Sequence, residues 1–368
     1  MKKIQSCITT VSYLCISFFF STTLYAQPPS GRDTTVEVTM DKSAPKDAYI
    51  WNGESGGSQS DPATFKNNWV CLSSTSPNNG QCPTQTVQEG SSTATYGAKS
   101  TIPLLFKEKK SGVTAIINLT AYRKVGGYGP WIINAAAVAG SSSPEALATF
   151  YVPKEEIAKF PFGGDWQAEL KVSLIQHYPS DAKAADWIAH VSLKLTDNNN
   201  QQIYLPEFGE AAPRVDLNMR PLPGTGGNQT QMNGAATIDM CLYDGYGSNS
   251  TSFTLKFDDQ QQGTIQRNNG YFSIYSDHGD VNLDSGRIDY YVKMQGPDGK
   301  YTSVIRGEDL VIPDIQTARV RPVHLPGIPQ AVLCVPAPLQ LSTKTMDINS
   351  KQAGHYTGHL IVNFTPQL

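Results

Sequence analysis

An alternation of apolar and polar residues with a period of two recurs along most of the chain, and it restricts the fold more than any other feature of the sequence. Between positions 187 and 195 the apolar side of the pattern is formed by Trp187, Ala189, Val191, Leu193 and Leu195. A period of two is typical of a β-strand that buries one face. The same alternation occurs at 170–174, 253–257, 288–294 and 360–364. These runs predict a chain built mainly from strands.

Glycine-containing pairs separate the strand-like runs and predict tight turns. They are Asn79-Gly80, Gly163-Gly164, Asp244-Gly245, Asn269-Gly270 and Asp298-Gly299. Helical patterns are few, and the best of them, at 153–160, is only about two turns long. Many short strands joined by regular turns predict an all-β chain of the β-sandwich type.

The chain of 368 residues is long enough for two domains of ordinary size. Charged residues make up only 17% of it, and 29 lysines and arginines against 32 aspartates and glutamates give a net charge of −3. A protein that binds nucleic acid normally has a basic surplus or a clustered basic face, and neither occurs in this sequence. The composition favours β-rich extracellular domains and excludes nucleic acid as the expected partner.

The first 26 residues have the pattern of a secretory signal peptide. Lys2 and Lys3 precede an apolar stretch that ends at Ala26, a small residue suited to cleavage. A single membrane anchor is the alternative, but Ser17 and Ser21 interrupt the stretch, which is too short for the roughly 20 apolar residues that span a bilayer. We therefore expect cleavage after Ala26 and an exported protein.

Removal of the signal peptide would leave four cysteines, Cys71, Cys82, Cys241 and Cys334. Four cysteines in an exported chain indicate two disulfides, for which three connectivities exist. Because a candidate linker separates the two pairs, we expect Cys71–Cys82 and Cys241–Cys334. A zinc site is the alternative, but separations of 11 and 93 residues do not fit the close paired spacing of zinc ligands.

The clearest domain boundary is the polar stretch at 196–202, which follows a strong strand pattern and has no apolar anchor. A division there gives a signal peptide at 1–26, an N-terminal domain at 27–197, a short linker at 198–201 and a C-terminal domain at 202–368. Each domain then contains one cysteine pair. The glycine-rich stretch at 223–227 is an alternative linker, but we expect it to be a loop inside the second domain, because 204–221 already has strand-like runs.

The motifs that suggest catalysis or metal binding each lack a required feature. Residues 53–57 fit G-x-S-x-G, but turn-forming residues follow where a nucleophile elbow needs a helix. His355 and His359 have the spacing of a zinc pair, yet they lie in a strand-like segment without an intervening glutamate. The three aspartates between 277 and 284 miss the spacing of an EF-hand. We expect no catalytic residue, no metal and no cofactor, and hence a protein that is not an enzyme.

The strand pattern at the C-terminus is more specific. Leu360, Val362 and Phe364 alternate shortly before the last residue, and Tyr356 and Gly358 precede them. A sandwich that ends on such a strand and lacks its final partner has an apolar groove and an unpaired edge, which aggregate unless they are covered. An extended segment of a neighbouring subunit can add the missing strand, with backbone hydrogen bonds for affinity and alternate side chains for specificity. An ordinary edge strand at the end of a domain is the alternative.

Several longer motifs point to a known family. They are KFPFGGDW at 159–166, YLPEF at 204–208, RVDLNMRP at 214–221, DMCLYDGY at 239–246, VLCVP at 332–336 and GHYTGHLIVNFTP at 354–366. In this order they resemble the minor tip subunits of class 5 fimbriae, also called CblD-like pilus biogenesis initiators. The best-known member of this family lies at the tip of colonisation factor antigen I fimbriae. The resemblance covers most of the chain after residue 26 and is strongest over 159–257 and 330–366.

The resemblance implies two immunoglobulin-like β-sandwich domains in tandem, an adhesin domain followed by a pilin domain. In this family the pilin domain is incomplete until the major pilin subunit donates a strand, so Leu360, Val362 and Phe364 would border the groove for that donor strand. A periplasmic chaperone occupies the groove beforehand, and an outer-membrane usher exports the tip subunit first. The protein would then be secreted through the periplasm and reside at the tip of a fimbrium on the bacterial surface.

The expected receptor site is where the sequence departs from the family. The best-known member presents three arginines to a host-surface glycoconjugate. At the matching positions this chain has Lys66 in place of the first, and Gln176 and His177 in place of an adjacent pair. Lysine keeps the charge but loses the planar bidentate fork of arginine, and Gln176 carries no charge. We expect these three residues to form the receptor site; the alternative is that they are solvated surface residues.

The leading hypothesis is a fimbrial tip adhesin that binds a host-surface glycoconjugate and initiates pilus assembly through the chaperone–usher pathway. One alternative is a structural initiator of the pilus without receptor binding. Another is a secreted carbohydrate-active enzyme on a β-sandwich, which would need a pair of carboxylates held in a cleft, and the sequence spacing reveals no such pair.

Overall fold

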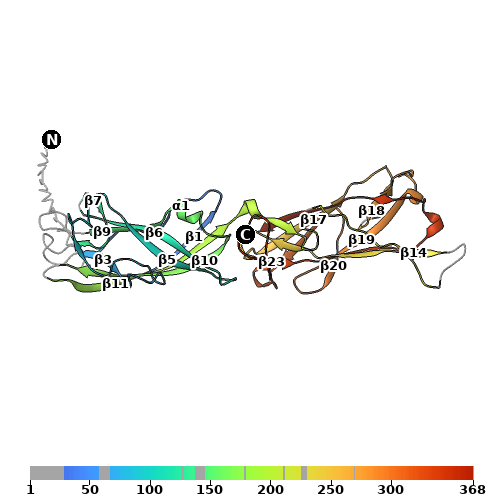
Figure 1. The fold of residues 1–368 in the computed structure, drawn as a ribbon. Coiled ribbons are helices and arrows are strands. Elements are labelled where there is room, and N and C mark those ends of the chain that lie inside the picture. The colour runs from blue at the N-terminus through green and yellow to red at the C-terminus, as the bar shows by residue number, and fades with distance from the viewer. Residues whose placement is uncertain are drawn as a thin grey trace, which may run out of the picture.

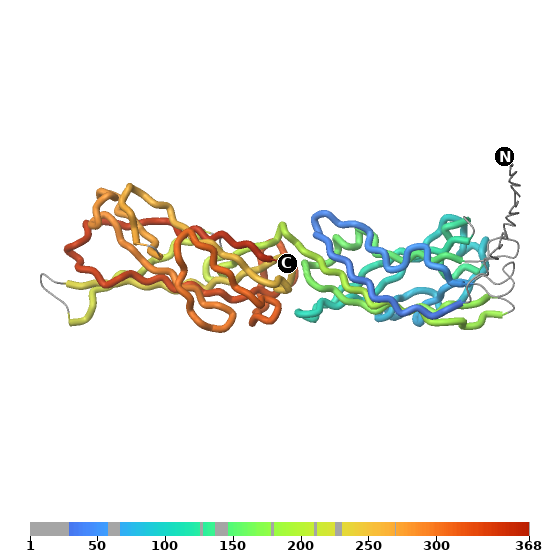
Figure 2. The backbone as a smooth tube through the Cα atoms, turned by 180° about the vertical axis from the view of Figure 1, so that it is seen from behind, coloured from blue at the N-terminus to red at the C-terminus, as the bar shows by residue number. Residues whose placement is uncertain are grey.

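The computed structural model describes residues 29–57, 67–125, 128–136, 146–177, 180–209, 212–224, 230–268 and 270–367. The expected signal peptide at 1–26 lies outside them. Within these residues the chain is almost entirely strand, turn and extended connection, and the single α-helix, α1 (Lys154–Ile157), has four residues. Figure 1 and, from behind, Figure 2 show an elongated molecule in which two β-rich domains follow one another end to end. The expectation of a nearly all-β chain with two domains is thereby confirmed.

The first domain is organised by one continuous path of hydrogen-bonded strands. Its order is β1-β11-β10-β5-β6-β9-β2, with β3 paired to β10 and β7 paired to β6. The strands are β1 (Arg32–Asp41), β2 (Ala48–Ser55), β3 (Asn67–Cys71), β5 (Ser100–Glu108), β6 (Thr114–Val125), β7 (Tyr128–Trp131), β9 (Ala146–Val152), β10 (Gly164–Gln176) and β11 (Ala182–Thr196). Two short strands, β4 (Val87–Gln88) and β8 (Ala135–Ala136), pair in parallel beside this path. Strand β10 changes partner along its length, since Trp166 and Gln167 pair with β5 and its last five residues pair with β3.

Strand β11 illustrates why the alternating segments form strands. The five apolar residues predicted to face the core, from Trp187 to Leu195, are at most 2% exposed. The ring of Trp187 packs edge-to-face against Trp51 and Trp69, with ring centroids 5.1 and 5.0 Å apart. The four other predicted runs also lie in strands, namely β10, β17 (Ser252–Asp259), β19 (Arg287–Gln295) and β27 (Leu360–Gln367). Burial of one face per strand therefore builds the cores of both domains.

The helix expected at 153–160 is wrong in length. Only α1 is helical, and the backbone N–H groups of Lys159 and Phe160 donate to the carbonyl oxygens three residues earlier, which tightens the chain into turns. Pro161 disfavours a helical conformation of the residue before it. Phe160 and Phe162 are each 1% exposed, so burial of both rings in the core fixes the turn that replaces the second helical turn.

The second domain contains several smaller sheets around its own apolar core. One has the order β15-β24-β19-β18-β26 with β20 beside β19, another is β21-β17-β27, a third is β12-β16-β23-β22, and a fourth is β13-β14-β25. The remaining strands are β12 (Gln202–Tyr204), β13 (Arg220–Pro221), β14 (Gln231–Asn233), β15 (Ala235–Ile238), β16 (Cys241–Tyr243), β18 (Phe272–Ser276), β20 (Tyr301–Ser303), β21 (Asp309–Pro313), β22 (Arg321–Val323), β23 (Val332–Pro336), β24 (Leu339–Thr343), β25 (Met346–Asp347) and β26 (Tyr356–Thr357). Because β13 pairs with β14, the glycine-rich stretch after β13 connects two paired strands of this domain. The turn expected at Asp298-Gly299 is present between β19 and β20, whereas Asn269 lies outside the described residues.

Both expected disulfides are present. Cys71 bonds Cys82 and Cys241 bonds Cys334, with Cα atoms 5.2 and 5.8 Å apart. This confirms the predicted pairing among the three possible ones. In the chain-entropy account, loops of this length correspond to about 3 kcal/mol for the first bridge and about 5 kcal/mol for the second.

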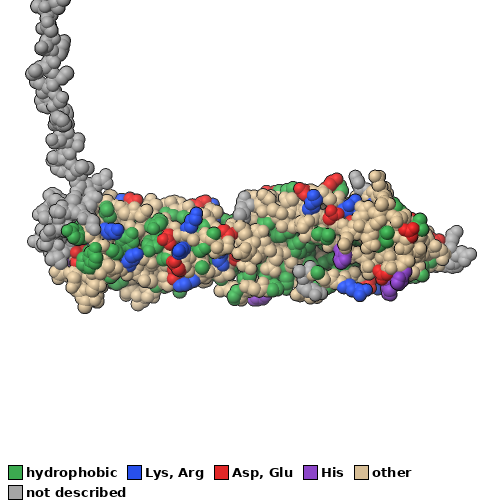
Figure 3. Space-filling view, turned by 90° about the horizontal axis from the view of Figure 1, so that it is seen from above, with side chains coloured by type: hydrophobic (Ala, Val, Ile, Leu, Met, Phe, Trp, Pro, Cys, Tyr) green, Lys and Arg blue, Asp and Glu red, His purple; other side chains and the backbone are tan. Residues whose placement is uncertain are grey.

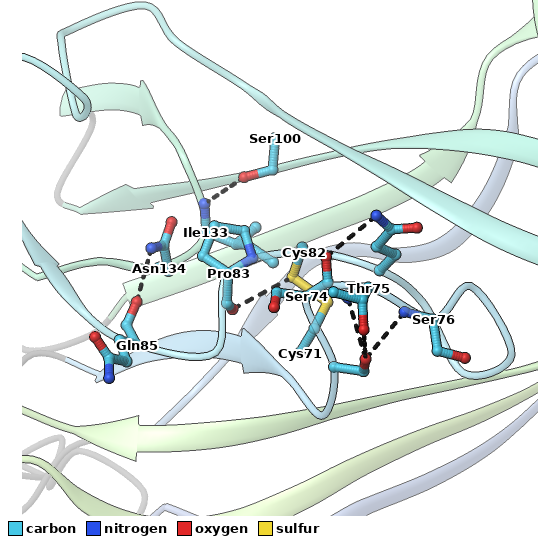
Figure 4. The surroundings of a disulfide bond; sticks show 12 residues. Cys71, Ser74, Thr75, Ser76, Cys82, Pro83, Gln85, Ser100, Ile133 and Asn134 are labelled. Atoms are coloured by element: carbon cyan, nitrogen blue, oxygen red, sulfur yellow. Dashed lines mark hydrogen bonds between the residues drawn. A yellow bond between two sulfur atoms is a disulfide. The ribbon is translucent and has the colours of Figure 1, made fainter.

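Hydrogen bonds reinforce the first disulfide, whose surroundings are shown in Figure 4. The backbone N–H of Cys71 donates to the carbonyl oxygen of Pro83 at 3.1 Å, and that of Cys82 donates to the carbonyl oxygen of Ser73 at 3.2 Å. The hydroxyl oxygen of Ser73 in turn accepts from the N–H groups of Thr75 and Ser76. The covalent bond and the backbone hydrogen bonds thus fix the loop that follows β3.

The two domains meet through backbone contacts at glycines. The sequence predicts a turn at Gly163-Gly164, but Gly164 begins β10 and Gly163 lies against the second domain. A Cβ atom at Gly163 would lie 2.0 Å from the carbonyl oxygen of Gly245. The same carbonyl accepts from the N–H of Asp197 at 2.8 Å. Only a residue without a side chain allows this approach of the two backbones.

Polar side chains complete this junction. Lys110 extends from the first domain, and its Nζ donates to the carbonyl oxygens of Ser248 at 2.6 Å and Ile315 at 3.3 Å. Burial lowers the pKa of Lys110, while the carboxylates of Asp244 and Glu108 act in the opposite direction. Glu108 is fully buried and accepts a hydrogen bond from the side-chain amide of Asn249 at 3.2 Å. The junction is therefore a specific interface with paired polar groups.

Substitution of Gly163 by alanine is expected to open the junction. The added methyl group would overlap the carbonyl oxygens of Gly245 and Leu195, at 2.0 and 2.7 Å, and overpacking of this kind costs about 1–3 kcal/mol. Chemical unfolding should show that loss, and limited proteolysis should cut faster near 198–201. Gly296→Ala is the control, because its nearest neighbour, at 3.1 Å, is the flexible side chain of Asp298. Equal stability and equal cleavage of the two variants would contradict this account of the junction.

Candidate functional site

Two of the three predicted receptor residues lie at the end of one strand. Gln176 is the last residue of β10, and His177 follows it, whereas Lys66 lies outside the described residues. Asn67, the residue after Lys66 in the sequence, begins β3 and pairs with Gln176 in the antiparallel ladder. The pairing of β3 with β10 thus brings the start of β3 beside Gln176.

A buried amide fixes the start of β3. Asn67 is 1% exposed, and its Nδ2 donates to the carbonyl oxygens of Gly56 and Gly57, both at 2.8 Å. These glycines belong to the G-x-S-x-G sequence at 53–57, whose Ser55 is the last residue of β2. This part of the glycine-rich segment therefore anchors the backbone of β3.

A carboxylate accompanies His177, and sequence reasoning missed it. The Nδ1 atom of His177 lies 2.7 Å from Oδ1 of Asp181, and both side chains are exposed. An anionic ligand that approaches His177 would therefore also meet the negative charge of Asp181. Exposed pairs of this kind contribute about 0–1 kcal/mol to stability, so the contact matters more for ligand charge than for folding.

A second charged group in the same hairpin was also missed. Lys183, on β11, pairs with Ile175 on β10, and its Nζ lies 2.7 Å from Oδ1 of Asp186. The signal in the sequence was the shortness of the segment between Gln176 and Ala182, since antiparallel neighbours joined by a short loop bring residues on either side of it together. The hairpin therefore presents Gln176, His177 and Lys183 near one another.

The last strand, β27, has the geometry of an edge with an apolar face. It pairs along its full length with β17, from Leu360 opposite Asp259 to Gln367 opposite Ser252. Within the described part of the chain, β27 ends the β21-β17-β27 sheet, and its other edge has no strand partner. An edge of this kind presents backbone N–H and C=O groups that another strand can pair with.

The side chains of β27 alternate between the core and solvent. Leu360, Val362 and Phe364 are half-buried and pack against the core of the second domain. The ring of Phe364 makes an edge-to-face contact with Phe253, with centroids 5.0 Å apart. Ile361, which points the other way, is 45% exposed. The core-facing side chains of β27 therefore contact the core of the second domain but remain partly exposed to solvent.

A groove lies beside the start of β27. Its volume is about 810 Å³, and its lining includes apolar residues at 213–219 on one side and the segment 352–358 on the other. Residues 213–219 belong to no assigned strand, and Asn218 has a positive φ of 50°. Val215, Leu217 and Met219 are turned toward the core, while the residues between them are exposed. Figure 3 shows hydrophobic side chains at the surface of the second domain. An uncovered stretch of core thus lies between residues 213–219, which belong to no strand, and the segment that contains β26, which pairs with β18.

The described residues contain no cluster of three or more histidine, cysteine, aspartate or glutamate side chains that could hold a metal ion. The aspartates noted in the sequence each have a nearby partner: Asp277 accepts from Thr357, Asp280 from Asn282, and Asp284 pairs with Lys351 at 2.9 Å. In the same residues, no helix has the length and apolar character needed to cross a membrane.

Comparison with known sequences gives matches over both domains. The family model for the first domain of CfaE, a subunit of CFA/I fimbriae, matches residues 21–198, and the family model for the second domain of CfaE matches residues 201–368. The CfaE fimbrial subunit of Escherichia coli CFA/I is 32% identical over 312 residues, which span 81% of this chain and 79% of that protein.

Comparison with solved structures gives the same relationship. The crystal structure of CfaE, the adhesive subunit of the CFA/I fimbria of enterotoxigenic Escherichia coli, superposes with a TM-score of 0.76 at 28% identity and covers 93% of this chain and 94% of that chain. A chain from a structure of a chaperone–tip adhesin complex in CFA/I fimbriae biogenesis superposes with a TM-score of 0.67 at 27% identity, covering 93% of this chain and 98% of that one.

Substitution of Asn67 by alanine is expected to loosen the start of β3. It would leave the buried carbonyl oxygens of Gly56 and Gly57 without their donor, at a cost of about 1–3 kcal/mol in the free energy of unfolding. Thermal or denaturant unfolding of the variant would measure the loss. Asn78→Ala, at an exposed position in a turn, is the control and should change stability by less than about 0.5 kcal/mol. Two equally stable variants would argue against an anchoring role of Asn67.

Proposed function

Because the chain belongs to the CfaE family of CFA/I fimbrial subunits, we propose that it is a fimbrial tip adhesin that binds a host-surface glycoconjugate and initiates pilus assembly. The observation that carries the assembly role is the open edge of β27 beside a partly covered apolar core. The related adhesive subunit supports the receptor role. Both roles are binding functions and need no catalytic group.

In this proposal, residues 27–197 form the adhesin domain, 198–201 a short linker and 202–368 the pilin domain, both domains being immunoglobulin-like sandwiches. Most buried apolar residues of the second half form a cluster of their own, which supports this division. The ranges of the two family matches support it as well. The pilin domain is incomplete on its own and requires one further strand.

The missing strand would enter along β27. Its backbone would pair with the free edge, and its alternate apolar side chains would cover the core beside Leu360, Val362 and Phe364. Full burial of each such side chain would contribute about 1.5–3 kcal/mol. The major pilin subunit would donate the strand in the finished fimbrium. A periplasmic chaperone would occupy the same groove earlier, and an outer-membrane usher would export the tip subunit first.

The groove can be tested with a pair of neighbouring substitutions. The mature chain is expected to aggregate alone and to become monomeric when a peptide with the donor-strand sequence of its major pilin is added. Val362→Asp should abolish this rescue, because a carboxylate would be placed in the apolar groove. Ile361→Asp is the matched control, since the side chain one residue away faces solvent and rescue should persist.

Size-exclusion chromatography with and without the peptide gives the readout. A mature chain that is monomeric and unfolds cooperatively without any added strand would contradict the incomplete domain. Equal rescue of the two variants would contradict the placement of the groove along β27.

The receptor site proposed for the adhesin domain consists of Lys66, Gln176 and His177. Lys66 and a protonated His177 would supply positive charge to an anionic sugar, and Gln176 would supply hydrogen bonds. Asp181 works against such a ligand because its carboxylate lies 2.7 Å from the imidazole of His177. This opposing charge favours the second candidate function, a structural initiator without receptor binding.

Binding to host epithelial cells and to a glycan array would separate the two candidates. Lys66→Ala combined with His177→Ala should reduce binding roughly tenfold, whereas Asp181→Asn should strengthen binding of anionic glycans because it removes the opposing charge. Lys300→Ala combined with His278→Ala, both exposed positions in the second domain, is the control. If the folded wild-type protein binds no cell and no glycan, the structural initiator is the better description.

A further inference from the structure

The outer side of one sheet of the first domain carries exposed apolar and basic side chains. The sheet consists of β5, β6, β9 and β2, paired in this order. On β6 the residues with odd numbers from 117 to 125 are buried, whereas those with even numbers from 114 to 124 face outward and none of them is buried. Residues that pair directly in a ladder point to the same side of a sheet, so the register of β6 identifies the outward residues of β5 and β9 as well.

Apolar side chains lie near both ends of this outer side. Ile116 of β6, which is 58% exposed, pairs with Leu105 of β5. Leu147 of β9, which is 38% exposed, pairs with Lys124 near the other end of β6. At a strand rise of about 3.3 Å per residue, Ile116 and Lys124 are roughly 25 Å apart. The apolar side chains are therefore distributed along the sheet rather than gathered at one point.

Tyrosines lie between these apolar positions. Tyr49 of β2 is 44% exposed and pairs with Tyr151 of β9, and the two rings stack with centroids 5.2 Å apart. Tyr151 also pairs with Thr120 of β6, two residues before Tyr122. A tyrosine combines an apolar ring with a polar hydroxyl group, which suits a boundary between an apolar phase and water.

Three lysines lie on the same side of the sheet. The Nζ atoms of Lys99 and Lys124 are 5.2 and 5.6 Å from the ring centroid of Tyr122, which faces outward on β6. Lys107 of β5 pairs with Thr114, another outward residue of β6. All three lysines are exposed, and within the described ranges none of them forms an ion pair with a carboxylate.

The acidic side chains of the neighbouring elements have other partners. In β2, the carboxylate of Glu54 lies 3.0 Å from the guanidinium of Arg32. The two glutamates of α1 are paired with lysines of their own segment, Glu155 with Lys154 and Glu156 with Lys159. The positive charge on the outer side of the sheet is therefore not compensated by these groups.

These side chains form one surface, which we call the lysine–apolar face. Its exposed members are Tyr49, Lys99, Lys107, Ile116, Lys124 and Leu147. Four strands about 4.8 Å apart make it roughly 15 Å wide and 25 Å long. It is a broad surface on which the basic and apolar groups alternate.

We propose that the lysine–apolar face binds the surface of an anionic phospholipid membrane. Its three lysines would lie beside the lipid phosphates, and its exposed apolar side chains would enter the boundary between head groups and acyl chains. A lysine can lay its apolar stem along such a boundary and keep its charge among the head groups. Each lysine close to an anionic leaflet strengthens binding about fivefold.

The composition of the face favours a membrane over a protein partner. Protein interfaces are enriched in arginine and depleted in lysine, and charged residues are excluded from their centres. Here lysines lie among the apolar side chains, and Arg123, the only arginine in these four strands, is buried on the opposite side of the sheet. A bilayer accepts this mixture, because it offers charge and apolar surface side by side over a wide area.

This inference goes beyond the proposed function, because its ligand carries no sugar and no residue of the face belongs to the proposed receptor site. Gln176 ends β10, which is not one of the four strands of the face. Glycan binding tests the receptor site, and binding to sugar-free vesicles tests the lysine–apolar face. Failure of one is therefore distinguishable from failure of the other.

The experiment measures co-sedimentation of the mature chain with lipid vesicles, with the donor peptide added where it is needed to keep the chain monomeric. One set of vesicles contains phosphatidylcholine alone, and the other contains an equal mixture of phosphatidylcholine and phosphatidylserine. The chain should bind the anionic vesicles at least tenfold more tightly than the neutral ones, and added salt should weaken this binding. Soluble glycerophosphoserine and sialyllactose should not displace it, since neither offers an apolar phase.

A triple lysine variant tests the charge. Lys99→Gln, Lys107→Gln and Lys124→Gln together should reduce binding to anionic vesicles at least tenfold. The control makes the same change at three exposed lysines of the second domain, Lys256, Lys293 and Lys300. It alters the net charge equally, and its binding should stay within twofold of wild type.

A double variant tests the apolar contacts. Ile116→Thr with Leu147→Thr should weaken binding at least tenfold, and the loss should persist at high salt. Both side chains are exposed and threonine suits a strand, so thermal unfolding should be nearly unchanged. Ile305→Thr with Val311→Thr, two exposed positions of the second domain, is the matched control and should bind as wild type does.

Four outcomes would overturn the proposal. Failure to bind any vesicle, or equal binding to neutral and anionic vesicles, would remove the anionic membrane as the ligand. Face variants that bind as well as their controls would place the contact elsewhere. Displacement by glycerophosphoserine would indicate recognition of a single head group, and displacement by sialyllactose would assign the surface to a glycan.

Discussion

Strand β10 is the element on which the rest of the first domain depends. It pairs with β11 over its whole length, with β5 at its start and with β3 at its end. Its first residue adjoins the glycine contact at the junction, and its last residue, Gln176, lies at the opposite end of the domain. One hydrogen-bonded strand thus positions both the junction with the second domain and the proposed receptor residue Gln176.

The second domain depends on a different constraint. The backbone N–H and C=O groups at every strand edge need a hydrogen-bond partner, either another strand or water. On one side, the backbone of β27 is hydrogen-bonded to β17. Within the described ranges, its other side and residues 213–219 have no strand partner, although Val215, Leu217 and Met219 already face the core. The domain therefore exposes one strand edge beside partly buried core residues, an arrangement that suits the added strand of the proposed function.

Local sequence patterns were enough to predict much of the fold. Burial of one strand face imposes the alternation of apolar and polar residues seen from Trp187 to Leu195. A polar stretch that separates the cysteines into two pairs favours one disulfide within each pair. Prediction from local sequence patterns failed where tertiary contacts determine the conformation. Gly163 has the composition of a turn but serves a backbone contact with Gly245, a residue far away in the sequence. Asp181, the partner of His177, was missed although only four residues separate the two, because their contact depends on the hairpin that joins β10 to β11.

The second disulfide has a consequence outside its own domain. Cys241 and Cys334 join β16 to β23, and both cysteines belong to the same contiguous apolar cluster as the core of the first domain. Oxidation of the two cysteines therefore cross-links the part of the second domain that packs against the first domain. Reduction of this bond would remove a covalent support from the part of the second domain that packs against the core of the first.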